Sequence, residues 1–276
     1  MRRSLSAVLA LGAGLLVHTA ERAEALTISL AFVTSPTLDV FSVGTTAETF
    51  AAFGFTGMNT AQVQAGILAA VTNDYLGYPT GGPSPLPAGK ELNINFVMST
   101  SITAPTNGDS EYYFVSIGAN TTSDGFLGQA CVSCVRKPVE TGPNFGVTNG
   151  MIVGSILTDV IASALGGLAT TDTQRINLIA GTVSHEIGHA LSLPHPSSAL
   201  TNPGASSFSI MATGAPPTNM PNSQRILDRA FGYTEFDQLI DAIGVRDVSV
   251  PEPASLATLA LGSVVILLRA RRRTRA

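Results

Sequence analysis

One run of twelve residues, His185 to Pro196 (HEIGHALSLPHP), limits what this chain can fold into more than any other part of its sequence. His185 and His189 are four residues apart, so on an α-helix their imidazoles lie one above the other and can reach one metal ion. Glu186 lies about 100° further round the same helix and borders that ion. The run therefore predicts a helix that carries a zinc hydrolase site.

The sequence around this run predicts where the helix begins and ends. Apolar residues recur every three or four positions and form one stripe centred opposite the two histidines. They are Ile176, Ile179, Ala180, Val183, Ile187, Ala190 and Leu191. Thr171 and Gln174 fit a capping box at the start, and Pro194 predicts an end near Ser192. We expect the apolar stripe to pack on a core and His195 to turn back as a third metal ligand.

These residues resemble the metzincin clan of zinc peptidases, which share the motif HExxHxxGxxH and a downstream methionine turn. His185, Glu186, His189 and His195 match the motif. The run Ser209, Ile210, Met211 and Ala212 resembles the methionine turn, which implies that Met211 lies beneath the metal. Pro196, directly after the third histidine, is similar to the serralysin-like branch. The resemblance covers residues 171–212.

Two positions depart from the metzincin pattern. Ser192 stands where the motif has glycine, so the turn before His195 must accommodate a Cβ, at a cost if φ is positive there. Thr213 stands where some branches have a tyrosine, so no tyrosine role is expected. The histidine count supports the site nevertheless. The chain has four histidines, and apart from His18, in a predicted signal peptide, all belong to the motif.

Both ends of the chain look like processing signals. Arg2 and Arg3 precede a short apolar run, and Ala23-Glu24-Ala25 offers a cleavage site, so residues 1–25 are predicted to be a secretory signal peptide. An uncleaved anchor helix is the alternative, although the run is shorter than the roughly 20 residues that span a bilayer.

Residues 250–276 contain Pro251, Glu252 and Pro253, an apolar stretch and an arginine-rich tail. This segment resembles the PEP-CTERM sorting signal of Gram-negative bacteria, which implies transient membrane anchoring and processing by an exosortase-like enzyme. A plain single-span anchor is the alternative. We therefore expect an exported protein of the cell envelope, surface or extracellular matrix.

The remaining chain, residues 26–249, is expected to form one metallopeptidase domain. Between Leu26 and Pro253 there are 7 Lys and Arg against 17 Asp and Glu, a net charge near −10, so nucleic acid is not expected as a partner. Strands are predicted at residues 27–34, 91–99, 111–117 and 151–157, helices at 59–78 and 223–231, and a loop at 77–90. This order fits an α/β (α+β) class. The resemblance implies a two-lobed domain with a twisted mixed sheet, backing helices and an irregular C-terminal part.

Cys131 and Cys134 are the only cysteines. In an exported protein the pair is expected to form a small disulfide, with a free or redox pair as the alternative. Because both lie outside the histidine motif, we expect them to be dispensable for catalysis.

Together these features predict an exported zinc-dependent endopeptidase that acts on proteins or peptides. Zn²⁺ would be held by His185, His189 and His195, with Glu186 as the general base. Residues 151–157 are the candidate for an edge strand along which substrate lies. Two alternatives remain: a non-catalytic zinc-containing surface or biofilm-matrix protein, which would need no base, and a hydrolase of a non-peptide amide.

Overall fold

The computed structural model describes residues 25–77, 86–103, 111–135, 150–197, 206 and 208–248. Most of the expected signal peptide, 1–25, and all of the sorting segment, 250–276, with Pro251, Glu252 and Pro253, lie outside these residues. In the part of the chain that is described, no helix is both long enough and apolar enough to cross a membrane.

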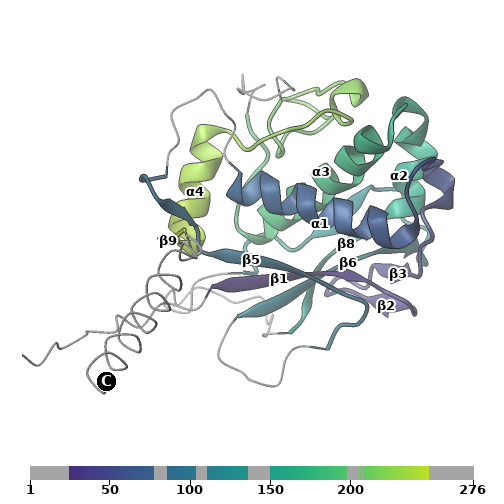
Figure 1. Ribbon diagram of the computed structural model, residues 1–276, viewed down its shortest axis with the longest axis horizontal. Coiled ribbons are helices and arrows are strands. Elements are labelled where there is room, and N and C mark those ends of the chain that lie inside the picture. The colour runs from purple at the N-terminus through teal and green to yellow at the C-terminus, as the bar shows by residue number, and fades with distance from the viewer. Residues whose placement is uncertain are drawn as a thin grey trace, which may run out of the picture.

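A mixed sheet forms the base of the fold (Figure 1). Four strands run parallel in the order β5-β1-β6-β8, and β7 adds to β8 in the antiparallel direction. In the short hairpin β2-β3, strand β3 pairs in the antiparallel direction with the C-terminal end of β6. The main strands are β1 (Leu26–Phe32), β5 (Ile94–Ser99), β6 (Tyr112–Asn120), β7 (Gly128–Ala130) and β8 (Ile152–Leu157), and the hairpin strands are β2 (Thr37–Leu38) and β3 (Gly44–Thr46).

Helices α1 (Thr60–Leu76) and α3 (Asp172–Ala190) lie side by side on one face of this sheet (Figure 1). The core lies between them and the strands, because alternate residues of β1 and every third or fourth residue of each helix point inward. Its fully buried members include Ile28, Leu30, Val63, Ile67, Val71, Ile179, Val183 and Ile187. The arrangement confirms an α+β class.

Both long helices begin as their sequences predict. The Asn59 side chain accepts a hydrogen bond from Gln62 N at the start of α1, and Thr171 accepts one from Gln174 N at the start of α3. In each case the glutamine side chain accepts from the cap backbone in return, which completes a capping box. The remaining helices are α2 (Thr158–Leu165), α4 (Tyr233–Ile243) and the single turns η1 (Ala51–Phe53), η2 (Gly166–Leu168) and η3 (Asn222–Gln224).

Three expectations about these elements need correction. The strand expected over 91–99 is two strands, because the chain changes partners at Asn93: β4 (Lys90–Leu92) pairs with β9 (Val245–Asp247), whereas β5 pairs with β1. Lys90, placed in the expected loop 77–90, therefore begins a strand. The helix expected over 223–231 is wrong beyond η3, and α4 begins after it, at Tyr233. Glu235 explains that start, since its carboxylate accepts from Gly232 N at the cap.

Candidate metal centre

Helix α3 carries His185 and His189 on the side away from the core, as their spacing predicts. The helix ends at Ala190, and the chain turns through Leu191 and Ser192 so that His195 comes back to the same place. The Nε2 atoms of His185 and His189 lie 3.2 Å and 3.0 Å from Nε2 of His195. The three histidines that the sequence singled out are therefore brought together.

Each helix histidine has its other ring nitrogen held by a backbone carbonyl. Nδ1 of His185 lies 2.9 Å from the oxygen of Ile210, and Nδ1 of His189 lies 2.8 Å from the oxygen of Leu193. A carbonyl can only accept, so each Nδ1 carries the hydrogen and donates, which leaves Nε2 with its lone pair. Burial lowers the pKa of both rings and of His195, which favours the neutral form that can bind a metal ion.

This geometry fits a zinc ion. At most one of the two short contacts between Nε2 atoms can be a hydrogen bond, because His195 has only one hydrogen to place there and the helix histidines have none. Three nitrogen ligands about 2.0–2.1 Å from a tetrahedral zinc ion would lie about 3.3 Å apart, close to the distances observed. The residues present therefore suit a cation at the point where their lone pairs meet.

Ser192 adopts the conformation that the motif glycine would adopt. Its φ is 80°, in the left-handed region, where a side chain is disfavoured. This turn orients the backbone so that Ser192 N donates to His189 O, Leu193 N donates to Gly188 O, and the Leu193 carbonyl faces His189. The serine thus keeps the turn at a cost in free energy.

We predict that Ser192→Gly raises the free energy of unfolding by up to about 1 kcal/mol, because glycine adopts this φ without strain. Zinc is also expected to bind more tightly, since less strain opposes the turn that carries His195. Ser123→Gly is a matched control: Ser123 has φ 63° but lies in an exposed loop and does not line the cleft. Urea unfolding and a competitive zinc titration measure both quantities. Equal effects on zinc affinity in the two variants would contradict the prediction.

Met211 lies buried beneath the helix that carries the ligands. A Cβ added to Gly188 would come within 2.5 Å of the Met211 sulfur, so the glycine between the two histidines makes room for it. The preceding residue, Ile210, provides the carbonyl that holds His185. Residues 210 and 211, in the expected methionine turn, thus contact α3 at His185 and Gly188.

Glu186 faces the cleft beside the histidines, under strand β7. The residue is 7% exposed, and its carboxylate has no hydrogen-bond partner among the described residues. Gly128 of β7 allows this approach, because a Cβ there would lie 2.9 Å from Glu186 Cγ. Burial raises the pKa of Glu186 to about 8, and a cation held by the neighbouring histidines would lower it again. The carboxylate is free to accept a proton from a group in the cleft.

Strand β7 forms one wall of the cleft, and the sequence reasoning missed it. Residues 127–130 line the cleft opposite the histidines. The expectation that 151–157 is an edge strand is wrong, since β8 is paired on both sides, with β6 and with β7. Among the described strands, β7 lines the cleft and is paired on one side, with β8. Three residues containing one glycine show no alternation, so no pattern in the sequence marked this strand.

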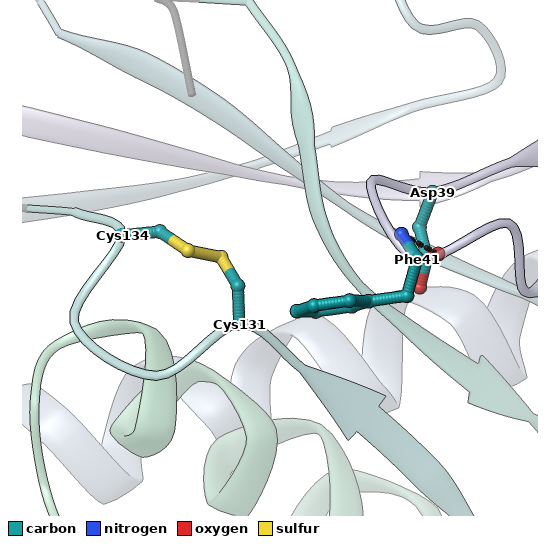
Figure 2. The surroundings of a disulfide bond; sticks show 4 residues. All are labelled: Asp39, Phe41, Cys131 and Cys134. Atoms are coloured by element: carbon teal, nitrogen blue, oxygen red, sulfur yellow. Dashed lines mark hydrogen bonds between the residues drawn. A yellow bond between two sulfur atoms is a disulfide. The ribbon is translucent and has the colours of Figure 1, made fainter. Parts of the chain in front are cut away.

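Cys131 and Cys134 are joined as a disulfide at the end of β7, where the ring of Phe41 from the β2-β3 loop points toward Cys131 (Figure 2). The loop between the cysteines contacts the histidine helix: Ser133 N donates to His189 O at 2.9 Å. Val132, in the same loop, lines the cleft. The pair thus has a contact with the histidine helix that its place in the sequence does not indicate.

We therefore predict that replacing Cys131 and Cys134 together with serine weakens both folding and activity. Closing a loop this small contributes about 2 kcal/mol to the free energy of unfolding, which the variant would lose. The cleft wall at Val132 would also become more mobile, so peptide hydrolysis should slow while the zinc content stays the same. Urea unfolding, elemental analysis and a peptide assay test this together. Full activity in the double variant would contradict this prediction and show that the pair is dispensable for catalysis, as the sequence indicated.

Comparison with known proteins adds one firm result. Residues 249–273 match the family described as the PEP-CTERM protein-sorting motif, which confirms the expected sorting signal. No curated protein matches the chain. One solved structure, titled "GM1 bound form of the ECX AB5 holotoxin", aligns with 77% of this chain and 74% of that chain at 13% identity and a TM-score of 0.33, a likeness too low to support any argument. The protein is exported and targeted to the cell envelope, with a signal that exosortase-type enzymes recognise.

Proposed function

We propose that this chain is an exported zinc-dependent endopeptidase with a metzincin-like, two-lobed catalytic domain. His185, His189 and His195 would hold the metal, and Glu186 would act as the general base. The observation that carries the proposal is the convergence of three Nε2 lone pairs at a cleft with an unpartnered carboxylate in its wall. A structural zinc site needs its ligands alone, so this carboxylate favours catalysis.

The chain's own residues suit each part of peptide hydrolysis. The outer edge of β7 has backbone groups that can pair with an extended peptide and lay it across the cleft. Zinc bound by the histidines would supply Lewis acidity toward a water molecule and the scissile carbonyl. Glu186 is positioned to take the proton of the attacking water and to return it to the leaving nitrogen. The buried position of Glu186 strengthens its hydrogen bonds to either group.

Two further features support the metzincin-like architecture. The sheet and helices α1 and α3 lie on one side of the cleft, whereas residues 191–197, 206 and 208–232 form a less regular part on the other. Met211 packs against Gly188, between the two helix histidines, which supports a methionine turn. A non-catalytic zinc protein of the surface or matrix is the competing function.

Elemental analysis and a peptide assay on the purified exported protein test the proposal. We expect about one zinc per chain, hydrolysis of a mixed pool of peptides, loss of both on treatment with a chelator, and recovery when zinc is added. Stoichiometric zinc without hydrolysis of any peptide would favour the non-catalytic function. Hydrolysis that survives complete removal of the metal would overturn the proposal.

A further inference from the structure

Arg225 lies in the wall of the cleft, across from β7. It follows η3 and lines the same cavity as Thr213, His185 and Glu186. Its guanidinium passes close to Gly214, where an added Cβ would lie 3.6 Å from Nη2. The side chain of a bound peptide that enters this part of the cleft beside the metal ligands would therefore meet a guanidinium group.

The guanidinium of Arg225 has no partner in the described part of the chain. Its Nε is buried without a hydrogen-bond acceptor, and no ion pair of the described residues includes it. The other arginines of this part are all engaged. Arg175 and Arg246 form ion pairs, and Arg229 donates to two backbone carbonyls. Desolvation by burial lowers the pKa of Arg225, with no carboxylate offsetting it.

A half-buried cation without a partner is unfavourable by itself and gains when an anion enters beside it. The guanidinium fork matches the two oxygens of a carboxylate, so a carboxylate would satisfy donors that are otherwise unpaired. Long-range electrostatic attraction would not draw an acidic substrate to this domain, because the chain between Leu26 and Pro253 carries 17 acidic residues against 7 basic ones. Recognition has to come from direct contact in the cleft.

We propose that Arg225 makes this cleft selective for substrates that present a carboxylate beside the scissile bond, in the first place the side chain of Asp or Glu. The inference rests on the proposed peptidase function and adds its substrate class. The C-terminal carboxylate of a peptide has the same chemistry, and peptides with blocked ends separate the two sources.

Cleavage profiling tests the inference with a peptide pool acetylated at the N-terminus and amidated at the C-terminus. We expect the cut sites of the full-length zinc protein to be enriched in Asp and Glu at one position next to the cut. For a peptide with Asp there, Arg225→Gln should lose roughly tenfold or more in kcat/KM, since a hydrogen bond to a charged group contributes about 1.5–3 kcal/mol. The ratio of kcat/KM for the Asp peptide to kcat/KM for the matched Asn peptide should fall by a similar factor, and Arg225→Lys should recover part of this ratio.

A change in this ratio separates selectivity from a structural effect, because a folding defect lowers hydrolysis of the Asp and Asn peptides alike. Arg246→Gln, in β9 and outside the cleft lining, is the control and should leave the ratio unchanged. Cleavage without acidic preference would overturn the inference and keep the proposed function. A second pool with free C-termini is profiled in parallel. If only this second pool shows a preference that depends on Arg225, Arg225 binds the terminal carboxylate and the inference for Asp and Glu side chains is overturned.

A binding measurement decides the inference even if no peptide is cleaved. Zinc-loaded Glu186→Gln protein is titrated with capped peptides that carry Asp or Asn at each position in turn. We expect at least one Asp peptide to bind roughly tenfold more tightly than its Asn partner, and Arg225→Gln in the same background to abolish the difference. Equal affinities for every pair would overturn the inference.

Discussion

Replacing Glu186 with glutamine is expected to lower peptide hydrolysis by about 10²-fold or more and to leave the zinc content unchanged. Glutamine has nearly the same shape, so it should fit against Gly128 as the glutamate does. The three imidazoles and the carbonyls of Ile210 and Leu193 that orient two of them are untouched by this change. Only the proton acceptor beside the metal is lost.

His189→Ala should lose both zinc and activity, because two protein ligands hold zinc poorly against solvent. The pair of variants separates the base from the ligand, with elemental analysis and a quenched-peptide assay as the readouts. Glu91→Gln, which removes a carboxylate that pairs with Arg246 on β4 and β9, is the control and should keep both properties. If Glu186→Gln cleaves peptides as fast as the natural protein, Glu186 is not the base.

Arg229→Met should lower the free energy of unfolding by about 3–5 kcal/mol, the second large effect that we expect. Arg229 is 5% exposed, and its Nη1 donates to the carbonyls of Ser209 and Ile210. The guanidinium also attracts the buried carboxylates of Asp74 and Glu235. Methionine fills similar space, but it removes one of the donors to each of these carbonyls and leaves two buried carboxylates without a cation.

The loss from Arg229→Met should be larger at pH 8.5 than at pH 5. Burial raises the pKa of Asp74 to about 7 from 3.8, although the Ser184 hydroxyl and Arg229 act against the rise. The folded protein therefore holds a proton that the unfolded chain releases between these values, so the stability contributed by this group falls as pH rises from about 4 to about 7. Without Arg229 the pKa rises further, and the fall extends to higher pH.

Urea unfolding at pH 5 and pH 8.5 measures the difference. Arg246→Met is the matched control, since it breaks a partly exposed ion pair with Glu91 and should cost about 1 kcal/mol or less at either pH. The Arg229 variant should also hold zinc less tightly, because the Ile210 carbonyl that Arg229 fixes also orients His185. A loss no larger than that of the control would show that the buried charges are compensated in another way.

Local signals in the sequence predicted the helix that carries the candidate ligands better than any other element. The capping box at Thr171, the apolar stripe and Pro194 are all short-range features, and α3 begins and ends as they indicate. The sequence also indicated that the turn at Ser192 costs free energy if φ is positive there, because the motif has glycine at this position. The φ of Ser192 is 80°.

Features that depend on long-range pairing could not be predicted. Asn93 looks like any residue inside a strand, yet its N–H donates to Gly244 and its carbonyl accepts from Leu26, so two sheets divide there. Strand β7 is defined by its partner β8 and has no pattern of its own. Arg225 and Arg229 lie four residues apart in a segment expected to be a helix, and only the folded chain shows that one lines the cleft and the other is buried.

The position of β9 decides how far the cleft can operate from a membrane. Only Val248 separates β9 from residue 249, where the sorting motif begins, and β9 is fixed to β4 by backbone pairing and by the Lys90–Asp247 and Glu91–Arg246 ion pairs. A domain of this size measures on the order of 40 Å across, and in the sequence residues 249–253 stand between it and the apolar stretch. While the sorting segment is attached and anchored, the proposed peptidase would meet only substrates within that distance of the bilayer. Removal of the segment would turn the proposed membrane-proximal peptidase into a diffusible one without disturbing β9.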